Sequence, residues 1–184
     1  MDTILAMDQI TIHDRKFKLH ISPETIANRI AEMAKELSIQ YAGKRPLFIA
    51  VLNGSFVFAA DLLRELSGDC EITFVKIKSY DGMESTGKGK VLVGLGENIK
   101  DRDVIILEDI IDSGNTIQQI LPQIEELKPN TTKVATLLFK PAAMKYDYNP
   151  DYIGFNIDNN FIVGYGLDYS GYGRDKKGLY VLNE

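Results

Sequence analysis

Three short and almost wholly apolar runs are the feature of this chain that most constrains its fold. They read LFIAVL at 47–52, VIILE at 104–108 and KVATLLF at 133–139. Runs of this length without polar alternation are typical of strands buried on both faces of a parallel sheet. A helical pattern at 116–127 separates two of them, so the sequence predicts βαβ units in an α/β fold, with a mostly parallel, twisted sheet flanked by helices.

Further segments extend this pattern. The sequence Ser-Pro-Glu at 22–24 favours the start of a helix, because serine caps, proline has no donor to lose and the acid suits the positive end of the helix dipole. The run SFVFAADLLREL at 55–66 is also helical in pattern, whereas EITFVKIKSY at 71–80 predicts a strand. Pro122 should kink or shorten the helix in which it lies.

The C-terminal region has a different character. Residues 141–184 are rich in Tyr, Gly, Asn and Asp, and they contain short strand candidates at 152–157 and 161–165. We expect this region and residues 1–20 to form a small lobe, or hood, attached to a core at about 22–140. Since 184 residues suffice for one hydrophobic core, we expect a single domain over 1–184.

Charge and cysteine content exclude several classes of partner. A formal net charge of -5 argues against a nucleic-acid surface, which needs a basic footprint. The single cysteine, Cys70, cannot form an internal disulfide, which fits a reducing compartment. The N-terminus lacks the basic start of a signal peptide, and no apolar run approaches the roughly 18 residues of a membrane span. We therefore expect a cytoplasmic protein that binds neither nucleic acid nor membrane.

Two adjacent acids follow the apolar run at 104–107. Glu108 and Asp109 repel each other at the end of a buried strand, where desolvation is also unfavourable, so they need a compensating partner. A divalent cation or the hydroxyls of a sugar would serve, and Mg²⁺ favours few carboxylates together with substrate oxygens. The alternative is that both acids are simply hydrated.

A small polar loop comes next. Residues 112–116, Asp-Ser-Gly-Asn-Thr, join the strand to a helix and offer a glycine, two hydroxyls and the free N–H groups of a helix start. Those are the components of a phosphate-binding loop. The alternative is an ordinary helix cap, in which Asp112, Ser113 or Thr116 satisfies the helix donors.

Together these residues resemble a known motif. LEDIIDSGNT at 107–116 is similar to the phosphoribosyl-diphosphate (PRPP) binding motif of the type I phosphoribosyltransferases, and the chain from about residue 10 onward resembles their hypoxanthine-guanine branch. The resemblance implies the type I fold. It also implies that Glu108 and Asp109 orient the ribose and bind metal, and that Asp112 is the general base near purine N7. The residues implied to hold the 5′-phosphate are Asp112, Ser113, Gly114, Asn115 and Thr116.

The segment VLNGS at 51–55 resembles the diphosphate loop of that branch. The resemblance implies that Asn53, Gly54 and Ser55 hold the diphosphate, together with Arg174 from YGRDKKG. Relatives often have a basic residue where Asn53 stands. They also tend to have a cis peptide in this loop, which points to the bond between Leu52 and Asn53.

KSYDGMESTGKGK at 78–90 resembles the lid that carries a Ser-Tyr pair, here Ser79 and Tyr80. The same stretch contains most of a Walker A pattern, but Gly89 stands where that pattern requires Ser or Thr, and a strand-like run follows instead of a helix. We therefore reject a nucleotide hydrolase. The alternative to a lid is a hydrated hairpin.

Four residues match the purine pocket of the branch. The resemblance implies that Lys140 hydrogen-bonds the purine 6-oxo group, which a donor-only ammonium would select over an amino group. It implies that Phe161 stacks on the base, that the backbone of Ile162 reads its Watson–Crick edge, and that Asp168 lies near the exocyclic position and a second Mg²⁺. Without the resemblance, Lys140 would be a hydrated lysine and Phe161 a core residue.

The function so implied is Mg²⁺-dependent transfer of phosphoribosyl from PRPP to hypoxanthine, and to guanine, in purine salvage. The partners are PRPP and 6-oxopurine bases, and the expected assembly is a homodimer or homotetramer. Two alternatives stay open at this point, namely a xanthine phosphoribosyltransferase and a PRPP-sensing regulatory protein that binds nucleic acid. His13 and His20 match no catalytic position.

Overall fold

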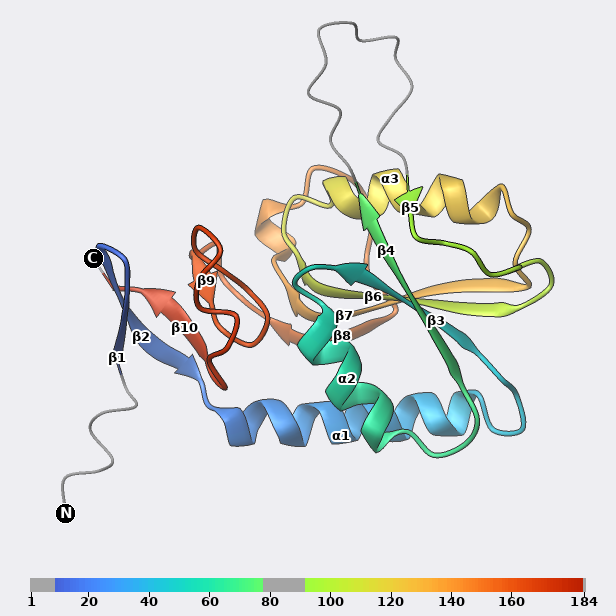
Figure 1. Ribbon diagram of the computed structural model, residues 1–184, viewed down its shortest axis with the longest axis horizontal. Coiled ribbons are helices and arrows are strands. Elements are labelled where there is room, and N and C mark those ends of the chain that lie inside the picture. The colour runs from blue at the N-terminus through green and yellow to red at the C-terminus, as the bar shows by residue number, and fades with distance from the viewer. Residues whose placement is uncertain (1–8, 78–91, 184) are drawn as a thin grey trace, which may run out of the picture.

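The computed structural model describes residues 9–77 and 92–183, which form two sheets and three α-helices (Figure 1). The large sheet contains, in spatial order, β5 (Leu92–Val93), β4 (Glu71–Ile77), β3 (Leu47–Leu52), β6 (Asp103–Ile111), β7 (Thr131–Phe139) and β8 (Tyr152–Asn156). The small sheet contains β1 (Gln9–Ile12), β2 (Arg15–Ile21), β10 (Leu179–Leu182) and β9 (Ile162–Val163). The helices are α1 (Pro23–Gln40), α2 (Phe56–Glu65) and α3 (Asn115–Glu125).

The large sheet is parallel from β4 to β8, and β5 pairs antiparallel with β4. Helices α1 and α2 cover one face and α3 covers the other (Figure 1). On β3, Phe48 and Ala50 pack toward α1 and α2, whereas Leu47, Ile49 and Val51 pack toward α3. This alternation explains the apolar runs, because both faces of the strand are covered. The predicted α/β fold with a mostly parallel sheet is confirmed.

Local signals set most element boundaries correctly. Ser22 caps α1, and its hydroxyl accepts a hydrogen bond from the N–H of Thr25 at 3.1 Å. Pro122 lies inside α3, which ends at Glu125, two residues before the predicted end. Of the helices that the structure describes, none is both long and apolar enough to cross a membrane.

The small sheet joins the two ends of the described chain, since β2 near the start pairs with β10 near the end. The predicted division of the chain needs one correction. We had placed all of 141–184 in the small lobe, but β8 pairs in parallel with β7 and forms an edge of the large sheet. The sequence predicts a strand at 152–157, but it does not show that this strand joins the large sheet.

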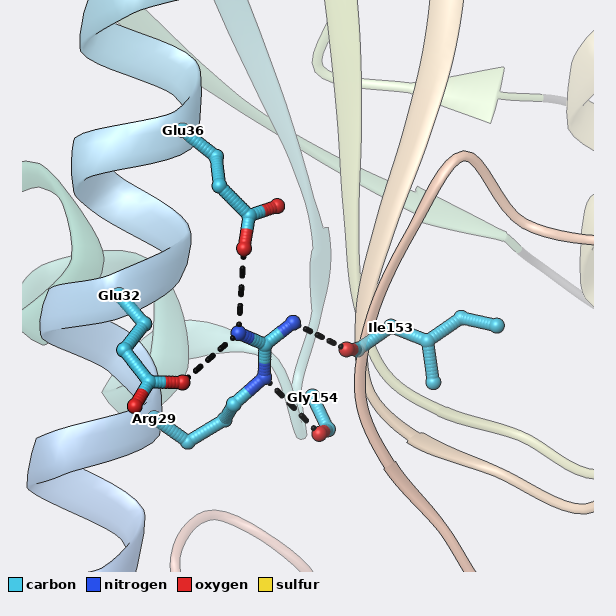
Figure 2. A network of polar contacts seen from close by, with 5 residues as sticks. All are labelled: Arg29, Glu32, Glu36, Ile153 and Gly154. Carbon is cyan, nitrogen blue, oxygen red and sulfur yellow. Dashed lines mark hydrogen bonds and ion pairs between the residues drawn. The ribbon is translucent and has the colours of Figure 1, made fainter.

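One arginine fixes that edge strand to the helical layer (Figure 2). The guanidinium of Arg29 on α1 donates to the backbone carbonyls of Ile153 at 2.8 Å and Gly154 at 3.1 Å. It also pairs with Glu32 and Glu36 at 3.1 and 3.2 Å. The arginine therefore ties the edge strand β8 to α1 through its backbone.

Candidate active site

The candidate site lies where β6 is paired on one side only. Strand β3 pairs with β6 only as far as Leu107, whereas β7 continues to pair with β6 as far as Ile111. The last residues of β6, including Glu108 and Asp109, therefore lie beyond its pairing with β3, although β3 itself continues to Leu52 alongside β4. The sequence had predicted that this strand ends at Glu108, so the acids lie within β6 and not after it. Carboxyl ends of parallel strands are where open α/β sheets bind ligands.

Two adjoining cavities lie at this edge. One, of about 280 Å³, is lined by Leu52, Asn53 and Gly54 from the end of β3 and by residues of β6 and α3. The other, of about 230 Å³, is lined by residues 108–117. Both include Glu108, Asp109, Asn115 and Thr116 among their lining residues. The acid pair and the polar loop, which the sequence linked by spacing alone, therefore share one concave surface.

Glu108 is buried and poorly compensated, and its neighbour Asp109 is partly buried. Glu108 is only 5% exposed, and among the residues that the structure describes its Oε2 has no hydrogen-bond partner. Burial, and then the neighbouring charge of Asp109, raise the pKa of Glu108 well above its usual range. Burial also raises the pKa of Asp109 to about 6, although its Oδ1 accepts a hydrogen bond from the N–H of Ile110 at 2.9 Å. The alternative of two hydrated acids is therefore wrong for Glu108.

Two glycines allow the chain to approach Asp109 closely. A Cβ at Gly54 would lie 1.5 Å from Oδ2 of Asp109, and a Cβ at Gly166 would lie 2.1 Å from the carbonyl oxygen of Gly54. The predicted diphosphate loop is thus held directly against the acid pair by the segment around Gly166. The bond between Leu52 and Asn53 is cis, as the resemblance suggested. Sequence reasoning missed Gly166, because nothing in the sequence reveals which loop packs on Gly54.

Ser55 is not placed as we had expected. Its hydroxyl is fully buried and donates to the carbonyl oxygen of Val51 at 2.6 Å, inside the turn between β3 and α2. A hydroxyl that is already bonded within the turn stabilises the loop and does not face the cavity. Asn53, in contrast, is exposed beside it.

The polar loop has the geometry of an anion site. Gly114 adopts φ 78° at the N-cap of α3, a conformation that favours glycine, and it makes no side-chain cap. Helix α3 begins at Asn115, so the first N–H groups of the helix face the region of the cavity. The alternative of an ordinary side-chain cap is not supported at this position.

An ion pair connects the loop to the end of β7. Nζ of Lys140 lies 2.8 Å from Oδ2 of Asp112, and the side chain of Lys140 is 7% exposed whereas that of Asp112 is 49% exposed. The backbone N–H of Lys140 also donates to the carbonyl oxygen of Ile111 at 2.9 Å. The predicted purine-binding lysine and the predicted general base are therefore direct neighbours.

A second ion pair lies beside the acids. Nη2 of Arg174 is 2.5 Å from Oδ1 of Asp168, while its Nη1 donates to the carbonyl oxygen of Gly166 at 2.6 Å. Oδ2 of Asp168 accepts from the N–H of Gly171 at 2.6 Å. Arg174 lowers and Asp168 raises the pKa of Asp109, so both charges act on the acid pair. In this structure both oxygens of Asp168 are occupied by protein donors.

The remaining predicted residues divide into two groups. Phe161 is 47% exposed on the small lobe, with its ring 5.9 Å from that of Tyr169 in an edge-on contact, and Ile162 is buried in β9. Neither residue is among those that line the two cavities. Ser79 and Tyr80, the predicted lid pair, lie outside the described residues.

Comparison with known proteins identifies the family of this chain. Residues 21–170 match the family described as the phosphoribosyl transferase domain. A hypoxanthine-guanine phosphoribosyltransferase of Streptococcus agalactiae is 40% identical over 91% of this chain and 93% of its own. A solved structure of a hypoxanthine-guanine phosphoribosyltransferase from Bacillus anthracis superposes with a TM-score of 0.82 at 36% identity, over 90% of this chain and 96% of that one.

The chain is also 38% identical, over 87% of its length, to the bifunctional protein TilS/HprT of Listeria monocytogenes, of which it spans 25%. With a family match over most of its length, the chain belongs to the phosphoribosyl transferase domain family. Within that family it belongs with the hypoxanthine-guanine phosphoribosyltransferases, since relatives of that name match over nearly their whole length.

Proposed function

We propose that the protein transfers the 5-phosphoribosyl group of PRPP to N9 of hypoxanthine or guanine, giving IMP or GMP and diphosphate. The observation that carries this proposal is the 2.8 Å ion pair between Lys140 and Asp112, at the edge where the acid pair and the polar loop share a cavity. In this pair Lys140, whose ammonium suits a 6-oxopurine, lies next to Asp112, which belongs to the predicted PRPP-binding loop. The names of the full-length relatives support the same activity.

The 5′-phosphate would bind at residues 112–116. Backbone N–H groups at the start of α3 and the positive end of its dipole favour a dianion there. The diphosphate would lie over Gly54, where the absence of a side chain lets the backbone approach, with Asn53 exposed beside it. Arg174 would release Asp168 and would then supply positive charge to the diphosphate.

In the proposed reaction the bond from ribose C1 to the diphosphate oxygen breaks, and its electron pair leaves with the diphosphate. The bond from C1 to N9 forms, and the purine loses a proton from its imidazole ring. Asp112, which is half exposed at the cavity, would accept that proton at N7 as general base. Glu108 and Asp109 would orient the ribose hydroxyls and stabilise the positive charge that develops on the sugar.

Lys140 would select the base. An ammonium group donates hydrogen bonds and accepts none, so it favours the 6-oxo group of hypoxanthine or guanine over the 6-amino group of adenine. Its side chain is 7% exposed and its ammonium lies 2.8 Å from Asp112, so the base would bind next to that carboxylate. Phe161 would stack on the base and the backbone of Ile162 would read its edge, as the resemblance implies.

The acid pair suits Mg²⁺ as a shared ligand of protein and substrate. Among the described residues no group of three or more acidic, histidine or cysteine side chains is placed to hold a metal alone. Glu108, however, has an unpaired buried oxygen next to Asp109, and Mg²⁺ characteristically takes one or two carboxylates plus substrate oxygens. Glu108 and Asp109 would hold the metal, which when bound neutralises the leaving diphosphate. Asp168 would contribute only after releasing Arg174.

Two features stay predictions from the resemblance alone, namely the closure of Ser79 and Tyr80 over the bound substrates and the homodimeric or homotetrameric state. The cytoplasmic location stays a prediction from the cysteine content and the N-terminal sequence. Closure would exclude water that competes with the base for the sugar cation.

A single assay tests the proposed activity. Purified protein is mixed with PRPP, Mg²⁺ and hypoxanthine, guanine, xanthine or adenine in turn, and nucleotide formation is followed by absorbance. We expect product with hypoxanthine and guanine. Product with xanthine alone would identify a xanthine phosphoribosyltransferase. Salt-dependent binding of RNA or DNA without turnover of any base would instead identify a regulatory protein that senses PRPP.

A further inference from the structure

The segment that follows β7 runs along the polar loop and is tied to it at several points. Lys140 donates its backbone N–H to Ile111, and five residues later Lys145 donates its own to the carbonyl oxygen of Ser113 at 3.2 Å. The 3₁₀ helix Pro141–Ala143 lies between these two bonds. Residues 140–146 therefore form a strap along the loop that we have assigned to the 5′-phosphate.

Two side chains of this strap cover Gly114. A Cβ at Gly114 would lie 2.8 Å from Cε of Met144 and 3.3 Å from Cδ2 of Tyr146. The hydroxyl of Tyr146 then donates to Oδ1 of Asn115 at 3.1 Å. Tyr146 is 41% exposed, so it is not a core residue. Its described contacts in this region are those with Gly114 and Asn115.

The hydrogen bond determines which end of the Asn115 amide is free. Asn115 is the first residue of α3 and lines both cavities at the acid pair. Its side chain ends in one acceptor oxygen and one NH₂ donor, and only the donor is attractive to an anion. Because the Tyr146 hydroxyl engages the oxygen, the NH₂ group remains available to the cavity. Without that bond the amide is free to rotate and present its oxygen.

We propose that Tyr146 is a positioning residue for the 5′-phosphate of the substrate, acting through the side-chain amide of Asn115. The inference deepens the proposed function and rests on it. It also places two residues that serve the substrates on one strap, with the purine-binding Lys140 at its start and Tyr146, which orients Asn115, at its end.

The test separates the two ends of PRPP by titrating wild type and Tyr146→Phe with three ligands in a calorimeter. Ribose 5-phosphate carries only the 5′-phosphate, pyrophosphate carries only the leaving group, and PRPP carries both. We expect Tyr146→Phe to weaken ribose 5-phosphate and PRPP by about fivefold, as for loss of one ordinary hydrogen bond, and to leave pyrophosphate unchanged. The matched control is Tyr172→Phe, which removes the hydroxyl of a tyrosine that is 63% exposed and should change none of the three.

A double-mutant cycle distinguishes positioning through Asn115 from a general loosening of the strap. In an Asn115→Ala background, Tyr146→Phe should cause no further loss of ribose 5-phosphate affinity. Asn115→Asp gives a second check, because it keeps an oxygen for Tyr146 but exchanges the donor for a negative charge, so it should weaken ribose 5-phosphate more than Tyr146→Phe does. In steady-state assays the effect of Tyr146→Phe should appear more in KM for PRPP than in kcat.

Three results would overturn the inference: unchanged ribose 5-phosphate affinity in Tyr146→Phe, an equal loss for pyrophosphate, or the same loss with and without Asn115. The proposed function fails separately, since it requires wild type to form nucleotide from PRPP and a base. A wild type that is active beside an unaffected Tyr146→Phe leaves the proposed function standing without this inference.

Discussion

Arg29 and Glu108 are both ionisable side chains that are largely withdrawn from solvent, but they differ in how many polar partners they have. Arg29 has four acceptors within 3.2 Å, two of them backbone carbonyls of β8 (Figure 2). Glu108 is more deeply buried, yet one of its oxygens has no partner among the described residues. A buried charge without a partner is strongly unfavourable, so the first region is arranged for stability and the second for a ligand that completes it.

This contrast implies that changes at the two regions should affect different measurements. Substitutions at the end of β6 should alter activity, and neutralising an acid there should increase stability. Substitutions in the Arg29 network should lower stability and leave the chemistry intact. The comparison would fail if substitutions at the two regions changed activity and stability in the same way.

The largest effect is expected for Asp112→Asn, because it removes the proposed general base. We expect kcat to fall by about 100-fold or more, in the range usual for loss of a general base, with PRPP binding only modestly weaker. Stability should fall as well, because the ammonium of Lys140 is 7% exposed and loses its charged partner, although the amide oxygen of Asn can still accept a hydrogen bond from it. Steady-state kinetics and thermal unfolding measure the two quantities. Activity equal to that of wild type would remove the general-base assignment.

Arg29→Ala should be the next largest, with a loss of about 2 kcal/mol in the free energy of unfolding, mainly from two charged hydrogen bonds to backbone carbonyls. The ion pairs should contribute less, because the carboxylates of Glu32 and Glu36 are largely exposed. Chemical denaturation measures the loss, and kcat should not change. Arg64→Ala is the control, since Arg64 is 82% exposed and only 3.9 Å from its acidic partner. Equal effects of the two substitutions would argue against the anchoring role of Arg29.

How much of this contrast was visible in the sequence depends on the range of the interactions. Glu108, Asp109 and the loop after them could be predicted because a strand end and a helix start bring neighbours in sequence to one edge. The contact of Arg29 with β8, 124 residues away, could not, because no local pattern encodes it. The burial of the Ser55 hydroxyl and the approach of Gly166 to Gly54 also depend on packing between distant segments.

Asp109→Asn should stabilise the free protein in a pH-dependent way. Burial raises the pKa of Asp109 in the folded state to about 6, so ionising it destabilises the fold above that pH and has no effect below the pKa of the unfolded chain. The shift of the pKa from 3.8 to about 6 corresponds to about 3 kcal/mol, at about 1.4 kcal/mol per pKa unit. Because Asp109 is only partly buried and lines a cavity, solvent screens this cost, and the variant should be more stable by about 2 kcal/mol at pH 8. The difference should shrink between pH 6 and pH 4. The amide oxygen can still accept from Ile110, so that contact is preserved.

Denaturation of both proteins across this pH range, without Mg²⁺ or PRPP, measures the effect, and activity of the variant should fall. Asp69→Asn is the control, because Asp69 is 76% exposed and forms an ion pair with Arg45 at the surface. A variant that is less stable than wild type at pH 8 would show that Asp109 is compensated in the free protein after all.

The ion pair of Lys140 and Asp112 lies between the two extremes, because one partner is buried and the other is half hydrated. Lys140→Ala should therefore affect stability little, since water can solvate the remaining carboxylate. Base selection should suffer instead, with kcat/KM for hypoxanthine about tenfold lower, equivalent to one lost hydrogen bond from a charged donor. Base selection is measured as the ratio of kcat/KM for hypoxanthine to kcat/KM for adenine. Lys133→Ala is the matched control on β7, the strand that precedes Lys140, where the lysine pairs with Asp151 at 2.8 Å and should not influence the base. An unchanged ratio in Lys140→Ala would mean that the lysine serves only to hold Asp112, and the pair would then resemble the Arg29 network more than the acid pair.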